Sequence, residues 1–136
     1  MKKEVIHRNE WYWGRSVTVI LAGGYATIKV SVEDDDHSVA IISDLIVHSE
    51  RRGEGLGNLL LEKACLEAAA MGAKKVLLSV EPDSWMVGWY RRHGFIERGT
   101  AVRNCHESLL LEKSLSDERK KLALDRDLVH DSSFYF

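Results

Sequence analysis

The sequence predicts one mixed α/β (α+β) domain with a mostly antiparallel sheet, and three observations support this class. Strand-like segments on either side of Gly23-Gly24 indicate a β-hairpin. The nearly continuous apolar run 39–47 is typical of a central strand that is covered on both faces. An amphipathic helix over 57–71 connects this run to a strand at 75–80, and such crossovers join parallel strands.

The hairpin occupies the first part of the chain. Residues 16–21 and the alternating segment 25–32 are its predicted strands, and residues 3–8 fit a short additional strand. The acidic run 33–36 is expected to be a solvated turn that leads into the strand at 39–47.

The helix predicted over 57–71 has one apolar face. Its apolar residues recur at intervals of three and four positions, as in a helix that packs on a sheet, and Gly72 is placed to end it. The residues of this face are Leu60, Leu61, Ala64, Cys65, Ala68 and Met71. Cys65 is therefore expected to be a buried thiol, and because Cys65 and Cys105 form no ligand spacing, no metal site is expected.

Turn and helix-end signals define the C-terminal half. The segment 81–84 is a predicted turn in which Asp83 or Ser84 caps the following helix. Gly94 fits the position just after a helix, where a positive φ is required. The predicted elements are a helix at 85–93, antiparallel strands at 95–102 and 106–113, and an amphipathic helix at 114–130 within a C-terminal extension, 114–136.

Length and composition indicate a single globular domain, 1–136. The chain is 45% hydrophobic and 29% charged, and its formal net charge of −2 argues against nucleic acid as a partner. No apolar run reaches the roughly 18 residues of a membrane span. The polar N-terminal residues do not form a secretory signal, so a cytoplasmic location is expected.

The segment 51–58, Arg-Arg-Gly-Glu-Gly-Leu-Gly-Asn, is the most informative part of the sequence. Its glycines lie where a helix begins, so backbone N–H groups are open to a ligand, and the helix dipole adds roughly half a positive charge. Arg51 and Arg52 add two full charges, which makes phosphate the natural ligand. A Walker loop is excluded because the sequence contains no Gly-x-x-x-x-Gly-Lys-Ser/Thr motif, and the glycine spacing does not fit a dinucleotide fingerprint.

Two motifs together resemble the GNAT family of N-acetyltransferases. Arg52-x-x-Gly55-x-Gly57 resembles the family's Arg/Gln-x-x-Gly-x-Gly/Ala loop, and Tyr90-x-x-x-Gly94-Phe95 resembles its helix that ends in Gly-Phe. The resemblance covers residues 40–112. It implies a mixed, mostly antiparallel, twisted sheet with helices on both faces and a splayed parallel strand pair. It also implies acetyl-CoA as cofactor, and homodimers are frequent among family members.

The resemblance assigns residues to the coenzyme. The loop would hold the pyrophosphate, and the backbone of the fourth strand would pair with the pantetheine arm and polarise the thioester carbonyl. The implied cofactor-binding residues are Leu45, Ile46, Val47, Arg52, Gly53, Gly55, Leu56, Gly57, Asn58, Ser84 and Tyr90.

Acetyl transfer to an amine also needs proton transfers. Tyr90 is the expected general acid for the departing thiolate, because the pKa of a phenol, about 10, is close to the pKa of an alkyl thiol. Glu81, just past the fifth strand, is the expected base for the amine, with Asp44 and His48 as alternatives. Ser79 stands where some family members carry a glutamate base.

The chain departs from the family on the acceptor side. About 15 residues precede the first clear strand, so the family's first helices do not fit, and this side should be open. It could instead be completed by residues 115–136 or by a second subunit. Aromatic residues at 134–136 are expected to dock on the domain or on a partner chain. The acceptor is a small-molecule or peptide amine of unknown identity.

Two other functions remain open at this level. The chain could be a non-catalytic CoA-binding module or interaction subunit, or it could transfer another acyl group. Trp85 and Trp89 are expected to pack in the core, although one of them could border the acceptor cleft.

Overall fold

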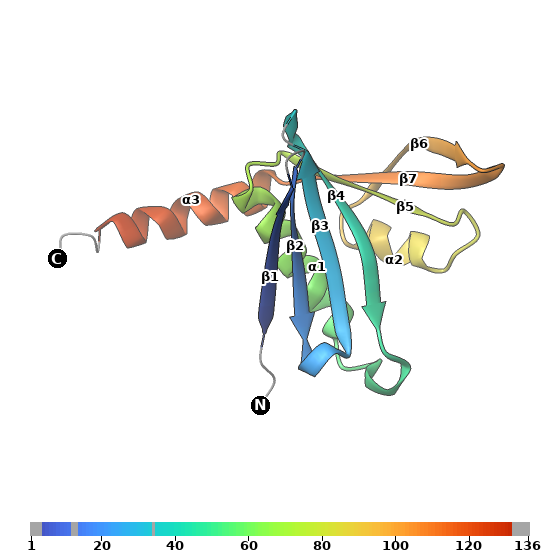
Figure 1. Cartoon of the computed structure of the whole chain (residues 1–136), viewed down its shortest axis with the longest axis horizontal. Coiled ribbons are helices and arrows are strands. Elements are labelled where there is room, and N and C mark those ends of the chain that lie inside the picture. Colours follow the sequence, from blue (N-terminus) through green and yellow to red (C-terminus); the bar gives the residue numbers. More distant parts are fainter. Residues whose placement is uncertain (1–3, 12–13, 34, 132–136) are drawn as a thin grey trace.

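The computed structural model describes residues 4–11, 14–33 and 35–131, and Figure 1 shows their arrangement. Short 3-10 turns at Ala22–Gly24 and Ser49–Arg51 join some of the elements. The strands are β1 Val5–Trp11, β2 Gly14–Leu21, β3 Ala26–Glu33, β4 Asp36–Val47, β5 Lys75–Val80, β6 Ile96–Arg103 and β7 His106–Ser114. The helices are α1 Leu56–Ala70, α2 Met86–Arg92 and α3 Ser116–Asp131.

The strands form one mixed sheet in the order β1-β2-β3-β4-β5-β7-β6. Neighbouring strands are antiparallel except β4 and β5, which are parallel as the crossover rule predicted. The predicted fold class of a mostly antiparallel sheet with one parallel pair is confirmed. The expected short strand at the N-terminus exists as β1, although it lies at Val5–Trp11 rather than at 3–8.

The parallel pair separates soon after it begins. Pairing between β4 and β5 extends only from Val39 opposite Lys75 to Ile41 opposite Leu77. Beyond this point the inner edges of the two strands diverge, so residues 42–47 of β4 have no strand beside them on the β5 side. The resulting gap in the middle of the sheet is the splay that the resemblance implied.

Cover of the sheet is uneven between its two faces. Helix α1 packs on β2, β3 and β4, where alternating residues such as Ile28 and Val30 are fully buried. On the opposite face, side chains of the same strands, such as Lys29, remain partly exposed. The expectation that the run 39–47 would be covered on both faces is wrong: Ile41 is 43% exposed. An apolar run predicts a strand, but it does not show that a helix covers the second face.

Helix α1 lies one residue earlier than the predicted 57–71, and its buried face is the predicted one except at Met71, which follows the helix and is half-buried. The predicted apolar residues contribute its buried side, and Gly72 follows the helix with a φ of +97°, as its capping position requires. In Figure 1, α1 lies behind the sheet.

Helix α3 packs against α1 and then continues away from the sheet (Figure 1). Leu115, just before it, is fully buried, and Lys113 pairs with Glu118 at 3.1 Å. The extension thus begins on the α1 side, so residues 116–124 do not complete the opposite, open face of the sheet. The aromatic residues at 134–136, for which docking was expected, lie outside the described residues.

Candidate functional site

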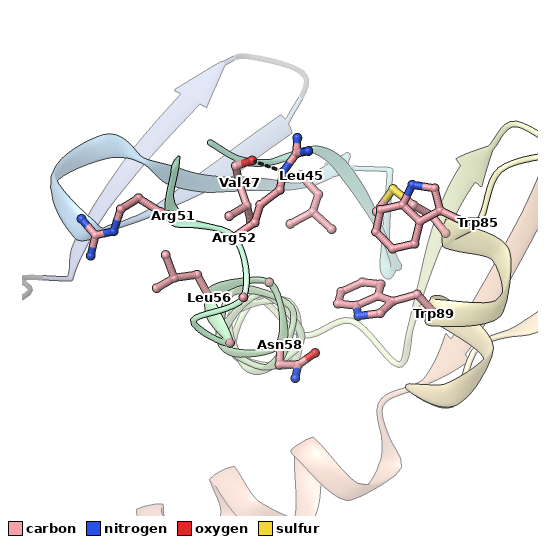
Figure 2. A pocket seen from close by; sticks show the side chains of 12 residues that line it. Leu45, Val47, Arg51, Arg52, Leu56, Asn58, Trp85 and Trp89 are labelled. Atoms are coloured by element: carbon pink, nitrogen blue, oxygen red, sulfur yellow. Dashed lines mark hydrogen bonds between the residues drawn. The ribbon is translucent and has the colours of Figure 1, made fainter. Parts of the chain in front are cut away.

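A cavity of about 480 Å³ lies between the end of β4, the loop into α1 and the start of α2 (Figure 2). It borders the gap left by the separation of β4 and β5. Its lining residues are Leu45, Val47, Arg51, Arg52, Gly53, Gly55, Leu56, Gly57, Asn58, Trp85, Met86 and Trp89. Eight of the residues that the sequence assigned to the coenzyme are therefore brought together by the fold.

The glycine loop leaves the N-terminus of α1 open. Gly53 and Gly55 have φ values of +86° and +78°, a conformation that side-chain-bearing residues rarely adopt. No side chain caps α1 at Gly55, and its first turn contains no acidic residue. The first N–H groups of a helix have no partner within it, so this turn can donate to an anion.

Gly57 creates space inside the cavity. A Cβ at this position would lie 3.5 Å from the Trp89 ring and 3.9 Å from the Val47 side chain. Those contacts are of ordinary length, so a larger side chain would occupy the space between α1, α2 and β4. A glycine here keeps that space open for a ligand.

The two arginines of the loop make different contacts. Arg51 donates through two nitrogens to Glu54, at 2.7 and 3.0 Å, and its guanidinium lies over the Tyr25 ring. Arg52 donates from Nε to the Val47 carbonyl at 3.1 Å, the contact drawn in Figure 2. Its terminal nitrogens are thereby held near the end of β4, while much of the Arg51 charge is balanced by Glu54.

The backbone at the end of β4 faces the gap. The His48 N–H donates to the Tyr25 carbonyl on the β3 side at 2.7 Å, so the Val47 carbonyl of the same trans peptide points away from β3. The β3–β4 register shifts just before Ile46, where Asp44 has a φ of +56°. Such a bulge turns backbone groups out of the sheet ladder.

Tyr90 lies beside this cavity but does not line it. It is 5% exposed and makes edge-to-face contacts with Trp89 and Phe95, with ring centroids 5.0 and 5.4 Å away. Desolvation by burial raises the pKa of Tyr90 to about 12. This pKa lies above that of an alkyl thiol, so the match expected from the sequence is not kept in the folded chain. The role of Tyr90 as general acid stays a prediction.

Glu81 lies away from the cavity and contacts His106. The imidazole Nε2 lies 2.5 Å from a Glu81 carboxylate oxygen, and both side chains are exposed. His106 is four residues before Leu110 in β7, and Leu110 pairs with Ser79 of β5. Side-chain alternation places His106 on the Ser79 face of the sheet, opposite the buried face that contains Leu78.

The other assigned residues lie around the site. Ser84 accepts a hydrogen bond from the Met86 N–H at 3.1 Å and so caps α2, as predicted. The Ile46 side chain is 58% exposed and points away from the cavity, which leaves only its backbone for the assigned role. His48, an alternative base, accepts from the Glu50 N–H at 3.3 Å and caps a 3-10 turn.

Sequence reasoning missed most of the α2 wall. Trp85 is 75% exposed, so the expectation that it packs in the core is wrong, whereas Trp89 does pack partly against the core. Figure 2 shows the two indoles on the opposite side of the cavity from Arg51 and Leu56. Their spacing of four residues on one helix was the available signal, but it does not reveal which structure that face meets.

The described residues contain neither a metal-binding cluster nor a membrane-spanning helix. Among them, no group of three or more His, Cys, Asp or Glu side chains could hold a metal ion. Within the same residues, no helix is both long enough and apolar enough to cross a membrane.

Comparisons with solved structures show a shared fold. A GNAT acetyltransferase from Elizabethkingia anophelis with acetyl-CoA bound is 14% identical, with a TM-score of 0.61 over 82% of this chain and 97% of that one. A spermidine/spermine N-acetyltransferase from Vibrio cholerae is 19% identical, with a TM-score of 0.63 over 81% and 70%. A nourseothricin acetyltransferase is 18% identical, with a TM-score of 0.62 over 82% and 84%.

Sequence comparisons identify the family. No curated protein was found to match the chain significantly. A family model described as an acetyltransferase (GNAT) domain, however, matches residues 10–97, which is more than half of the chain. That match spans the strands β2 to β5, the glycine loop and the Gly94-Phe95 end of α2. The chain therefore belongs to the GNAT acetyltransferase family.

Proposed function

We propose that this chain is an acetyl-CoA-dependent N-acetyltransferase that transfers the acetyl group directly to a primary amine. The observation that carries the proposal is the cavity, where the glycine loop, the open N-terminus of α1 and the unpaired edge of β4 meet. Membership of the GNAT family supports it. So does the shared fold with a family member that was solved with acetyl-CoA bound.

The proposed coenzyme contacts follow from the groups at the cavity. The backbone N–H groups of residues 53–58 and the terminal nitrogens of Arg52 would hold the pyrophosphate. The backbone of residues 45–47 would hold the pantetheine arm along the open edge of β4. Bound there, the coenzyme supplies an acyl group activated as a thioester. The residues present fit such a ligand, because the cavity of about 480 Å³ combines the open N-terminus of α1 and the Arg52 side chain with an apolar wall.

The proposed chemistry uses one acid, Tyr90, and one base, Glu81. Glu81, paired with His106, would take a proton from the acceptor ammonium. The amine nitrogen then forms a bond to the thioester carbonyl carbon, and the carbon–sulfur bond breaks. The departing thiolate would take the phenol proton of Tyr90. The nitrogen, which carries one extra proton after the new bond forms, would release that proton to water, and Tyr90 would be reprotonated from water.

The proposed acceptor is a small-molecule or peptide amine that approaches the uncovered face of the sheet. Polar and partly exposed side chains, such as Thr27 and Ser31, line that face. A second copy of the chain could complete it, so a homodimer stays a prediction, as does a cytoplasmic location. Light scattering of the purified protein, with and without amine, would test the oligomeric state.

Calorimetric titration with acetyl-CoA tests the coenzyme site. We expect saturable binding by the wild-type protein and none by an Arg52→Ala, Gly55→Val double variant. A matched control is Arg98→Ala with Gly88→Ala, since neither residue lines the cavity. Circular dichroism verifies that each variant folds. A folded wild type that binds no acetyl-CoA would end the acetyltransferase proposal, whereas binding justifies a screen of acceptor amines.

Two alternatives have a specific observation in their favour. The burial of Tyr90 away from the cavity lining favours a CoA-binding module without catalysis. The apolar lining contributed by Trp85, Met86 and Trp89 favours an acyl group longer than acetyl. Measuring turnover with a series of acyl-CoA chain lengths on an amine mixture distinguishes them: no turnover supports the module, and a maximum beyond acetyl supports the other acyl group.

A further inference from the structure

His93 links the two helices that border the cavity. It follows the last residue of α2, and its ring is partly buried. Nδ1 lies 2.7 Å from the Trp89 carbonyl oxygen, and Nε2 lies 2.9 Å from Oδ1 of Asn58 in the first turns of α1. The imidazole also lies against the Trp89 indole, with ring centroids 4.3 Å apart.

The hydrogen bonds of His93 can form in either protonation state. The Trp89 carbonyl only accepts, so Nδ1 must carry a proton and donate to it. A charged imidazole would then also donate from Nε2 to the Asn58 oxygen. A neutral imidazole would accept from the Asn58 amide nitrogen after the amide turns over, because the amide contains both kinds of group. The link to Asn58 therefore survives the loss of a proton.

Both partners of His93 line the cavity. Asn58 belongs to the α1 wall and Trp89 to the α2 wall. Gly57 has no side chain to contact the α2 wall, and even a Cβ added there would lie 3.5 Å from the Trp89 ring. Helix α2 is short, Met86–Arg92, and only two of its residues, Val87 and Tyr90, are buried, so few side chains anchor its position.

We propose that His93 is a positioning residue, which sets the spacing between α1 and α2 by bonding Asn58 and Trp89 together. The inference rests on the proposed coenzyme site, because the width of that cavity is what His93 would fix. Losing this link lets the α2 wall move away from the α1 turn. Affinity for acetyl-CoA then falls, while the acetyl transfer step itself is unchanged.

A double-mutant cycle measured by calorimetry with acetyl-CoA tests this role. We expect His93→Leu to raise Kd about tenfold, the size expected for one or two lost hydrogen bonds, and His93→Gln to recover most of it. In an Asn58→Ala background the same His93→Leu change should have a clearly smaller effect. Arg91→Ala on the same helix is the matched control, since that side chain pairs with Glu97 away from the cavity.

Several outcomes would overturn the inference. An unchanged Kd in His93→Leu would do so, as would an equal effect of that change with and without Asn58. In either case the coenzyme site itself would stand if the wild type binds acetyl-CoA. Hydrogen exchange without coenzyme gives an independent readout: faster exchange in α2 of His93→Leu is expected, and unchanged exchange contradicts the link. A wild type that binds no acetyl-CoA removes both proposals.

Discussion

The two faces of the sheet differ in what covers them near the β4–β5 gap. On one face, α1 buries residues such as Ile28, and the glycine loop forms a cavity with α2. On the other, Ile41 and the Glu81–His106 pair are exposed. The comparison teaches that this GNAT fold builds a cavity beside the gap while the other face of its sheet is left uncovered.

Replacement of Tyr90 by Phe should have the largest effect on the chemistry. Loss of a general acid typically slows a reaction by about 10²–10⁴-fold. We expect turnover with the best amine to fall within this range, because the phenol proton no longer reaches the thiolate, while the acetyl-CoA Kd stays within about twofold. Equal turnover of variant and wild type would remove the acid role and favour a purely structural Tyr90.

Matched isoleucine truncations on the two faces test their difference in burial. Ile28→Ala, at a fully buried position, should lower the free energy of unfolding by about 2–5 kcal/mol. Ile46→Ala, at an exposed side chain of the neighbouring strand, should cost less than about 1 kcal/mol. Urea denaturation measures both, with Ile28→Val as the milder variant. A similar cost for the two would mean that the exposed face is covered in solution.

Filling the cavity at Gly57 should weaken coenzyme binding in steps. We expect Gly57→Ala to raise the acetyl-CoA Kd modestly, and Gly57→Val to raise it by about 10–100-fold, because overpacking of this size costs about 1–3 kcal/mol. Gly88→Ala in α2 is the control, because the added Cβ would meet only the flexible end of the Arg92 side chain. Undiminished binding by Gly57→Val would place the coenzyme elsewhere.

The buried phenol should also make stability depend on alkaline pH. Because the pKa of Tyr90 is raised by burial to about 12 in the folded chain, the unfolded chain loses this proton first, at about pH 10. The contribution of this pKa shift to the free energy of unfolding is therefore fully present below pH 10 and is lost as pH rises toward 12. Its total size is on the order of 2 kcal/mol. Over this range the unfolding free energy of the wild type should fall by this amount relative to that of Tyr90→Phe, which has no phenol; parallel curves would contradict burial of the phenol.

Changes at the Glu81–His106 pair should have the smallest effect. Glu81→Gln should lower turnover about tenfold. This loss is smaller than the loss expected for a buried base, because water reaches this exposed site and can take the proton instead. His106→Gln should lower it less, and Glu107→Gln is the control on the same strand. Coenzyme affinity should not change in any of them. If Glu81→Gln leaves the pH profile of turnover unaltered, another group is the base.

Much of the structure around the cavity could be predicted from sequence, because the signals that define it are local. Gly53 and Gly55 lie next to the helix that they begin, and Gly94 lies next to the helix that it ends, so short-range backbone rules suffice. The same holds for the crossover that made β4 and β5 parallel.

The remaining features depend on contacts between distant segments. His93 meets Asn58 across a separation of 35 residues, and His106 meets Glu81 across 25, which no periodicity encodes. The exposure of Trp85 and Ile41 likewise depends on what the fold places beside them. An apolar side chain looks the same in a sequence whether it meets a helix, a ligand or water.

The separation of β4 and β5 gives the sheet four strand edges instead of two, and the additional two lie at its centre. An edge strand presents backbone donors and acceptors that pair with any extended chain. An inner edge admits only a narrow molecule that can insert lengthwise, which excludes another protein's sheet but suits a thin amide-containing arm. If acetyl-CoA binds at this edge as proposed, the folded protein gains stability as the coenzyme concentration rises, since a ligand that binds only the folded chain stabilises it by mass action.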